Sequence, residues 1–237
     1  MAKHIGIVAV SPEGSALCYR MIGRRASEID DPALRPLLTL HNRPFNDYVD
    51  ALQRDDWNAI AQLLIQSAQA LAAVGCDFCV LPDNVAHHAL QMAEVSSPLP
   101  FLNMIELVAD QVERSGCDTV ALLGTKFVMR GSTYQTLLGL RGIKLVIPED
   151  HDADMIDEII FREAVYGRVR PESRELVERV VHRLRERGCE AIILASTEGA
   201  LMVDPSDGPV PVLDPLELLA DAAIVRACNE ESMRETA

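Results

Sequence analysis

The chain has 237 residues and a formal net charge of −14 at pH 7, with 36 acidic against 22 basic side chains. Because no basic stretch offsets this charge locally, we expect neither nucleic acid nor an anionic membrane as a partner. Apolar residues make up 49% of the chain and aromatic residues only 4%, a composition typical of helices stacked on buried parallel strands.

The compartment and the metal content are inferred from short patterns. The residues after Met1 lead into an apolar run that is too short for a signal peptide, and no segment reaches the roughly 18 apolar residues of a membrane span. We therefore expect a cytoplasmic protein whose six cysteines are reduced thiols. Cys76 and Cys79 form a single C-x-x-C without a second pair at zinc-ribbon spacing, so we expect no metal site.

In chain order, the first half alternates buried strands with helices. An apolar run predicts a strand over residues 5–10, after which Ser11 turns the chain into a helix. A second strand is expected at residues 37–41 and a helix at residues 57–74. This helix leads into the segment 75–84, a turn followed by a third buried strand.

The second half repeats this plan. A helix from about Val85 and the proline-containing segment 98–103 are expected to connect the halves. The elements predicted after this connection are strands at 118–125, 144–148 and 209–214, and helices at 153–166, 172–187 and 215–233.

One sequence pattern occurs twice. Gly75-Cys76-Asp77 opens the first copy and Gly188-Cys189-Glu190 opens the second, and in both copies an apolar strand and small polar residues follow. Asp83 is the eighth residue after the first glycine, and Ser196 is the eighth after the second. The pattern therefore indicates two similar lobes.

Four polar residues follow the predicted strands at matched spacing. Ser11 and Asp83 are 72 residues apart, and Thr125 and Ser196 are 71 residues apart. In open α/β sheets, ligands lie outside the carboxyl ends of the strands. Each of these residues also precedes a helix N-terminus, which favours an anion. The pattern predicts a small carboxylate as the ligand.

The predicted fold class is α/β, with two doubly wound, Rossmann-like lobes. Each lobe would have a parallel sheet, a pseudo-twofold axis would relate the lobes, and a cleft would lie between them. We expect residues 1–102 and 211–237 to form the N-terminal lobe, to which the C-terminal helix returns. Residues 103–210 would form the second lobe.

These motifs resemble the aspartate/glutamate racemase superfamily. Pro82-Asp83-Asn84-Val85-Ala86-His87 resembles the family pattern Pro-Cys-Asn-Thr-Ala-His, and Ala195-Ser196-Thr197-Glu198 resembles Gly-Cys-Thr-Glu. The resemblance covers essentially the whole chain and extends to hydantoin racemases, maleate isomerase and arylmalonate decarboxylase. It implies a cofactor-independent, PLP-independent isomerase of amino-acid metabolism, commonly a homodimer, that acts on a small amino acid or dicarboxylate.

The chain departs from the family pattern at the residues that carry the chemistry. Racemases of the family use two thiolates on opposite faces of the substrate α-carbon, whereas Asp83 and Ser196 stand at the two cysteine positions here. Val85 replaces the usual Thr, and Leu219 falls where a His often stands. The two-thiol mechanism is therefore impossible as written.

Asp83 and Ser196 are the predicted catalytic residues. An aspartate with its ordinary pKa near ~4 is a weak base unless burial raises that pKa. A serine hydroxyl without a neighbouring base transfers a proton poorly, so hydrogen bonding to substrate is the other role open to Ser196. His87, one helical turn beyond Asp83, could orient or protonate it.

Further residues are predicted to bind the substrate. Arg43 suits two-point recognition of a carboxylate, and the family pattern and the helix ends point to Asn84, Thr125 and Thr197. The complete predicted set is Ser11, Asn42, Arg43, Asn84, Val85, Thr125, Thr197 and Glu198.

Three functions stay open on the sequence. The first is racemisation, and the second is one-sided proton chemistry in a lyase, decarboxylase or isomerase, which needs only Asp83. The third is a catalytically inactive carboxylate-binding protein. Plainer roles compete with each assignment: Asp83 and Ser196 could cap helices, His87 could be a structural histidine, and Arg43 could lie on the surface.

Overall fold

The computed structural model describes residues 2–203 and 209–228. The chain divides into two compact units, the first formed by residues up to Met104 with the segment from Leu216 on, and the second by Ile105–Pro215. Residues 103–104 were predicted in the second unit but belong to the first, and residues 211–215 were predicted in the first unit. The structure groups residues 211–215 with the second, because strand β8 (Val212–Leu213) pairs with strand β7 (Ala191–Ala195).

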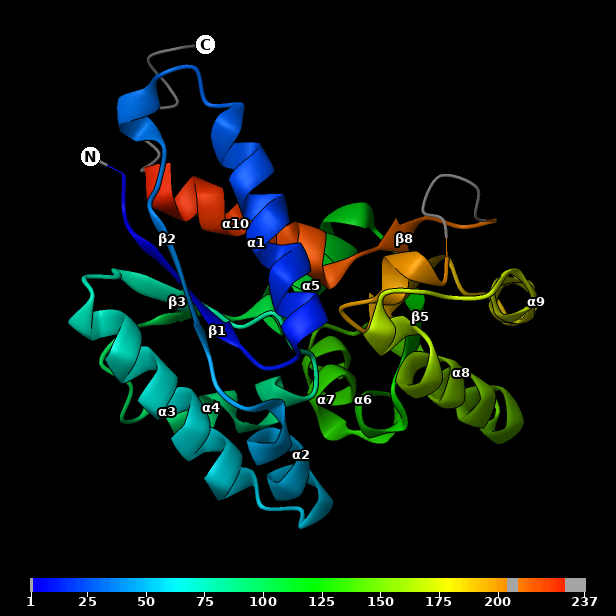
Figure 1. The fold of residues 1–237 in the computed structure, drawn as a ribbon. Coiled ribbons are helices and arrows are strands. Elements are labelled where there is room, and N and C mark those ends of the chain that lie inside the picture. The colour runs from blue at the N-terminus through cyan, green and yellow to red at the C-terminus, as the bar shows by residue number, and fades with distance from the viewer. Residues whose placement is uncertain (1, 204–208, 229–237) are drawn as a thin grey trace. The chain divides into compact units, whose positions relative to one another are not determined.

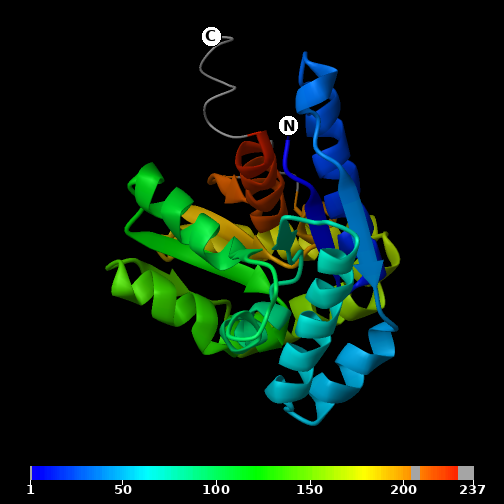
Figure 2. The same cartoon turned by 90° about the vertical axis from the view of Figure 1, so that its left-hand side faces the viewer.

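Four parallel strands form the sheet of the first unit, in the order β2-β1-β3-β4. The residues of β1 and β3 are all buried, as expected for central strands covered on both faces. Strand β2 is an edge strand and is partly exposed; it is the light-blue arrow that runs along the rim in Figure 2. The strands are β1 (Ile5–Ala9), β2 (Leu38–Asn42), β3 (Phe78–Val80) and β4 (Phe101–Leu102).

Helices cover both faces of this sheet. Figure 1 shows α1 and α10 on one face and α3 and α4 on the other. Buried residues of α3, such as Leu64 and Leu71, pack with Val8 of β1 in a continuous apolar core. The helices are α1 (Pro12–Ser27), α2 (Phe45–Gln53), α3 (Trp57–Ala73), α4 (Leu90–Glu94) and α10 (Pro215–Cys228), with 3₁₀ turns at Pro32–Leu34 and Ala86–Ala89.

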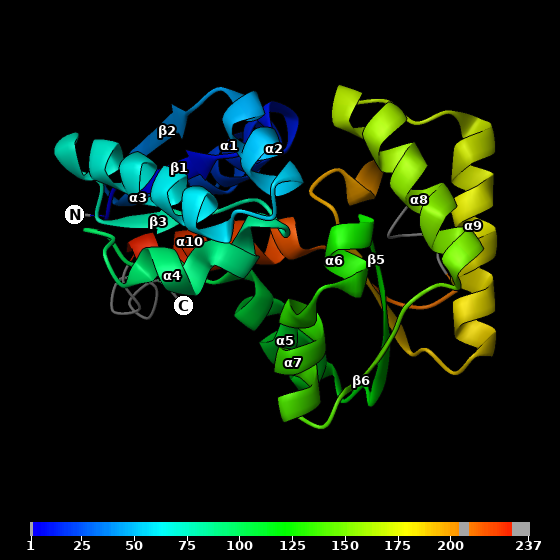
Figure 3. The same ribbon diagram turned by 90° about the horizontal axis from the view of Figure 1, so that it is seen from below.

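The second unit repeats the plan with the strand order β6-β5-β7-β8. Figure 3 shows α8 and α9 on one face of this sheet and α5 and α7 on the other. The additional strands are β5 (Thr119–Gly124) and β6 (Lys144–Val146). The helices are α5 (Met104–Ser115), α6 (Lys126–Arg130), α7 (Ser132–Leu140), α8 (Asp150–Arg162) and α9 (Pro171–Glu186), with 3₁₀ turns at Ala164–Tyr166 and Gly199–Leu201.

The repeated sequence pattern forms the same turn in both units. Gly75 and Gly188 follow the ends of α3 and α9 with φ angles of +87° and +89°, a left-handed conformation that favours glycine. The acidic residue of each copy then accepts hydrogen bonds from the adjacent strand. The Asp77 carboxylate accepts from the His4 amide at 2.6 Å, and the Glu190 carboxylate accepts from the amides of Asp118 and Thr119. The pattern therefore fixes the register at which each central strand enters its sheet.

The predicted fold class is confirmed, since each unit has a four-stranded parallel sheet with helices on both faces. Several local predictions were incomplete. The segment 98–103, predicted as a connection, contains the edge strand β4, and the helix predicted from Val85 begins as a 3₁₀ turn. The helices absent from the prediction are α2, α5, α6 and α7. The final helix is described only to Cys228, so its predicted continuation to residue 233 lies outside the described residues.

The two ends of the described chain meet in the first unit. The Lys3 amide donates a hydrogen bond to the Ala227 carbonyl at 2.8 Å, which joins the segment before β1 to the end of α10. Among the described residues, no helix combines the length and the apolar character that crossing a membrane requires.

Candidate active site

In the first unit, the predicted site residues lie at the carboxyl edge of the sheet. Ala9 of β1 is in register with Asn42 of β2, so the residues that follow these two strands are neighbours. Ser11 caps α1 and accepts a hydrogen bond from the Gly14 amide at 3.1 Å. Asp83 follows β3, which pairs with β1 on its other side. The parallel register thus brings these predicted residues to one edge.

Asp83 is partly buried and caps the turn after it. Its Oδ1 accepts a hydrogen bond from the Ala86 amide at 2.7 Å. An ionised carboxylate has two oxygens with several acceptor positions, so this cap does not use up its capacity to take a proton. Asn84 is 7% exposed and Val85 is partly buried. The capping role considered for Asp83 is therefore present, and it is compatible with chemistry at the same carboxyl group.

His87 is buried and both of its ring nitrogens contact backbone groups. Nδ1 lies 2.6 Å from the Asp83 carbonyl oxygen, and the Met104 amide donates to Nε2 at 3.1 Å. Because an amide can only donate, Nε2 is the acceptor and Nδ1 carries the proton. Burial lowers the His87 pKa to about 4, although the hydrogen bond to Asp83 opposes this shift. A neutral, fully engaged imidazole favours the orienting role over proton exchange with Asp83.

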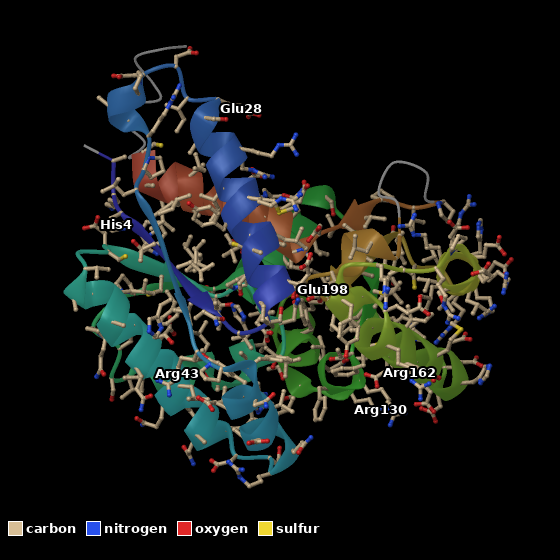
Figure 4. The ribbon with its side chains drawn as sticks, viewed as in Figure 1. His4, Glu28, Arg43, Arg130, Arg162 and Glu198 are labelled. Atoms are coloured by element: carbon tan, nitrogen blue, oxygen red, sulfur yellow. The ribbon has the colours of Figure 1, made fainter. Side chains whose placement is uncertain are left out.

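Arg43 lies where β2 leads into α2 (Figure 4). Its Nη2 lies 3.4 Å from Oδ2 of Asp47, one helical turn along, and its side chain is 30% exposed. Its Nε is buried and has no hydrogen-bond partner among the described residues. Tyr48 of α2 is buried and was not predicted as a site residue, because its position carries no periodic or motif signal.

In the second unit, close backbone contact places Thr125 beside Ser196. Gly124 and Ala195 are register partners at the ends of β5 and β7. A Cβ atom added to Gly124 would lie 2.6 Å from the Ala195 carbonyl oxygen, so glycine is required for this approach. Thr125, the next residue, caps α6 and accepts from the Val128 amide at 3.4 Å. The two predicted residues come after the ends of adjacent strands, as Ser11 and Asp83 come after β1 and β3 in the first unit.

Ser196 has a carboxylate partner. Its hydroxyl donates to Oε2 of Glu198 at 3.1 Å, across the turn that precedes Gly199–Leu201. Ser196, Thr197 and Glu198 are 6%, 7% and 4% exposed, so this polar group is buried. The expectation that the Ser196 hydroxyl has no neighbouring base is therefore wrong. The sequence did not reveal this pair, because the side chains of residues two positions apart need not approach each other in a turn.

Comparisons with known proteins decide the family. The Asp/Glu/hydantoin racemase family model matches residues 7–223, most of the chain. The chain belongs to this family. The resemblance found in the motifs is therefore confirmed, and membership supports a racemase-type enzyme, that is, an isomerase that acts on small amino acids.

Individual relatives agree with this assignment. The broad-specificity amino-acid racemase RacX of Bacillus subtilis is 22% identical over 207 residues, which are 87% of this chain and 86% of RacX. A crystal structure of a putative Asp/Glu racemase from Yersinia pestis is 29% identical and superposes with a TM-score of 0.86, covering 96% of this chain and 100% of that one. An aspartate racemase homologue from Pyrococcus horikoshii is 26% identical with a TM-score of 0.83, at the same coverage.

Proposed function

We propose that this protein is a cofactor-independent racemase that transfers a proton at the α-carbon of a small amino acid or dicarboxylate. Asp83 of the first unit and Ser196 of the second would be its two proton-transfer groups. The observation that carries the proposal is the buried hydrogen bond from Ser196 to Glu198, because it gives the serine a proton acceptor. Family membership supplies the reaction type.

Ser196 and Glu198 can act together as a proton relay. When the serine oxygen takes the α-proton of the substrate, its own hydroxyl proton passes to the Glu198 carboxylate. In the reverse direction, protonated Glu198 returns a proton to Ser196 as Ser196 gives one to the carbanion. This is the role of an adjacent base in activating a hydroxyl group. The pair therefore provides one competent group.

Asp83 provides the group for the other face. Its carboxylate takes the α-proton of one enantiomer and, once protonated, returns a proton to the carbanion formed from the other. Among the predicted substrate-binding residues, Asn84, Thr125 and Thr197 would hydrogen-bond the substrate. We also keep the predictions of a homodimer and a cytoplasmic location.

Hydrogen exchange with solvent tests this proposal. Purified protein is incubated in deuterated water with a panel of L- and D-amino acids and dicarboxylates, and NMR and chiral chromatography follow deuterium at the α-carbon and configuration. Deuterium incorporation with inversion supports racemisation. Loss of carbon dioxide or of a leaving group without inversion would identify one-sided chemistry instead. Binding without exchange across the whole panel would identify a carboxylate-binding protein.

A further inference from the structure

Two buried hydrogen-bond donors in the first unit have no partner among the described residues. They are the hydroxyl of Tyr48 and Nε of Arg43. Tyr48 is only 4% exposed. Native proteins pair nearly all buried polar groups, and an unpaired donor costs free energy, so each exception needs an explanation. A ligand that accepts hydrogen bonds from both groups is one.

Both donors belong to the carboxyl edge at which the site residues lie. Arg43 directly follows Asn42, the last residue of β2, and Tyr48 lies in the first half of α2, which begins two residues later. The contact between Arg43 and Asp47, at 3.4 Å, holds the guanidinium group against the first turn of α2. Tyr48 itself is packed in the apolar core with Ala51 and Ile60. Tyr48 is thus held in a packed helix, and Arg43 is held by its contact with that helix.

The charges of Asp83 and Arg43 both act on the Tyr48 hydroxyl. Burial is the main cause that raises the Tyr48 pKa to about 12; the charges of Asp83 and Asp47 raise it further, and Arg43 lowers it. A hydrogen-bonding interaction with the Ser67 side chain also lowers this pKa. The Ser67 hydroxyl is paired with Nδ1 of His41 at 3.1 Å and forms no hydrogen bond of normal geometry with Tyr48. At neutral pH the tyrosine therefore keeps its proton and acts as a donor.

The charge balance favours a small anion over a neutral ligand. A cationic Nε–H and a neutral O–H can each donate to one oxygen of a carboxylate, which is the two-point arrangement that arginine sites commonly use. The adjacent Asp83 must approach the substrate carbon to within about 3.5 Å to exchange its proton. A carboxylate that accepts hydrogen bonds from donors on the same side of the site is therefore the one attached to this carbon.

We propose that the Tyr48 hydroxyl and Nε of Arg43 together bind the carboxylate attached to the carbon at which Asp83 transfers a proton. As the proton leaves, negative charge moves onto the oxygens of this carboxylate, and donors already in place stabilise that charge. This inference rests on the proposed function and adds a recognition rule: the site requires a carboxylate at the reacting carbon, whatever the rest of the substrate is.

Three related ligands test the rule by binding, separately from catalysis. The probes are L-aspartate, L-asparagine, which keeps the α-carboxylate, and L-isoasparagine, which keeps only the side-chain carboxylate. Titration calorimetry is expected to show binding of the first two and at least about 10-fold weaker binding of the third, the loss of one charge-assisted hydrogen bond. Equal binding of all three, or no binding of any, would overturn the inference.

Tyr48→Phe isolates the hydroxyl. Affinity for L-aspartate should fall about 10- to 100-fold, while the melting temperature stays the same or rises, because the variant removes a buried donor that has no partner in the described part of the chain. Tyr134→Phe is the matched control, since Tyr134 is another buried tyrosine, 1% exposed, and lies in the second unit. The affinity of this variant for L-aspartate should equal that of the wild type. Unchanged affinity in Tyr48→Phe would overturn the inference.

The test of the carboxylate site and the test of racemisation can succeed or fail independently. If the wild type binds L-aspartate in a Tyr48-dependent way but exchanges no α-proton, the carboxylate site stands and the racemase proposal fails. If it exchanges protons but Tyr48→Phe binds and reacts normally, the racemase proposal stands and this inference fails.

Discussion

The imidazole of His87 is hydrogen-bonded to the carbonyl oxygen of Asp83 at 2.6 Å. Its other nitrogen accepts a hydrogen bond from the amide of Met104, which is the first residue of α5. One buried side chain therefore ties the backbone of the proposed catalytic residue to Met104, at the boundary of the first unit.

Replacing His87 should change the pH dependence of stability. The pKa of His87 is about 4 in the folded protein, below the ordinary value of 6.5. Between these values the unfolded chain binds a proton that the folded chain does not, so lowering the pH from 6.5 to 4 should reduce stability by up to about 1.4 kcal/mol per pH unit. His87→Leu should lack this component and, with the Met104 amide left unpaired, should be about 1–3 kcal/mol less stable at pH 7.

Urea denaturation at pH values from 4.5 to 7 measures both effects. The exposed His182, replaced by Asn, serves as the control and should follow the wild-type curve. A His87→Leu curve parallel to that of the wild type would refute the prediction.

The buried carboxylate of Glu163 should stabilise the second unit above pH 4.5. Hydrogen bonds from the Arg170 side chain, its amide and the Ser173 hydroxyl outweigh burial and lower the Glu163 pKa to about 2. Because the folded pKa lies below the ordinary value of 4.5, this stabilisation is complete above pH 4.5 and is lost as the pH falls toward 2.

Glu163→Gln should therefore cost about 1–3 kcal/mol at pH 7, toward the lower end because Arg170 is largely exposed. The difference from the wild type should shrink at pH 3. Glu158→Gln, which breaks an exposed pair with Arg162, should cost less than about 0.5 kcal/mol. Equal effects of the two substitutions in denaturation experiments would contradict the prediction.

Adding a methyl group at Gly124 should disturb the proposed relay. The new Cβ would lie 2.6 Å from the Ala195 carbonyl oxygen, so β5 and β7 must separate just before Thr125 and Ser196. We expect Gly124→Ala to lose about 1–3 kcal/mol of stability and most of its α-proton exchange. Gly139→Ala is the control, because a Cβ there, in α7, meets no atom within 4 Å; it should be more stable by up to about 1 kcal/mol. Thermal denaturation and the exchange assay measure both.

Removing one proton-transfer group should separate exchange from inversion. In Ser196→Ala, Asp83 can still take and return a proton on its own face, so one enantiomer should exchange its α-hydrogen for deuterium without inverting. Asp83→Asn should leave exchange of the opposite enantiomer. NMR of the separated enantiomers measures the deuterium at the α-carbon of each. Ser132→Ala, at an exposed serine, is a suitable control. Loss of exchange from both enantiomers in each variant would exclude independent proton transfer by the two groups.

The repeated turn could be predicted from the sequence, because the interactions that form it are local. A glycine with positive φ, an acidic residue that caps the neighbouring strand and a buried apolar run each leave a residue-type signature, so Gly75, Asp77 and their counterparts predicted the two sheets. The strand ends then followed from parallel topology. Strand β4 was missed because two residues between prolines and a helix carry no periodicity.

The chemistry at the strand ends was less predictable, because it depends on side-chain directions across turns. Nothing in the spacing of Ser196 and Glu198 shows that their side chains face each other. The Tyr48 hydroxyl, which has no hydrogen-bond partner within residues 2–203 and 209–228, likewise depends on its three-dimensional surroundings, since Ser67 and Asp83 are distant in sequence.

The hydrogen bond between Lys3 and Ala227 has a practical use. The first unit is discontinuous in sequence, because its last helix is encoded after the whole of the second unit. Joining the chain ends through a linker and opening the chain at Ile105 would give a circular permutant in which each unit is a single uninterrupted segment. Either half could then be produced separately, and complementation between two purified fragments could be measured in place of the intact enzyme.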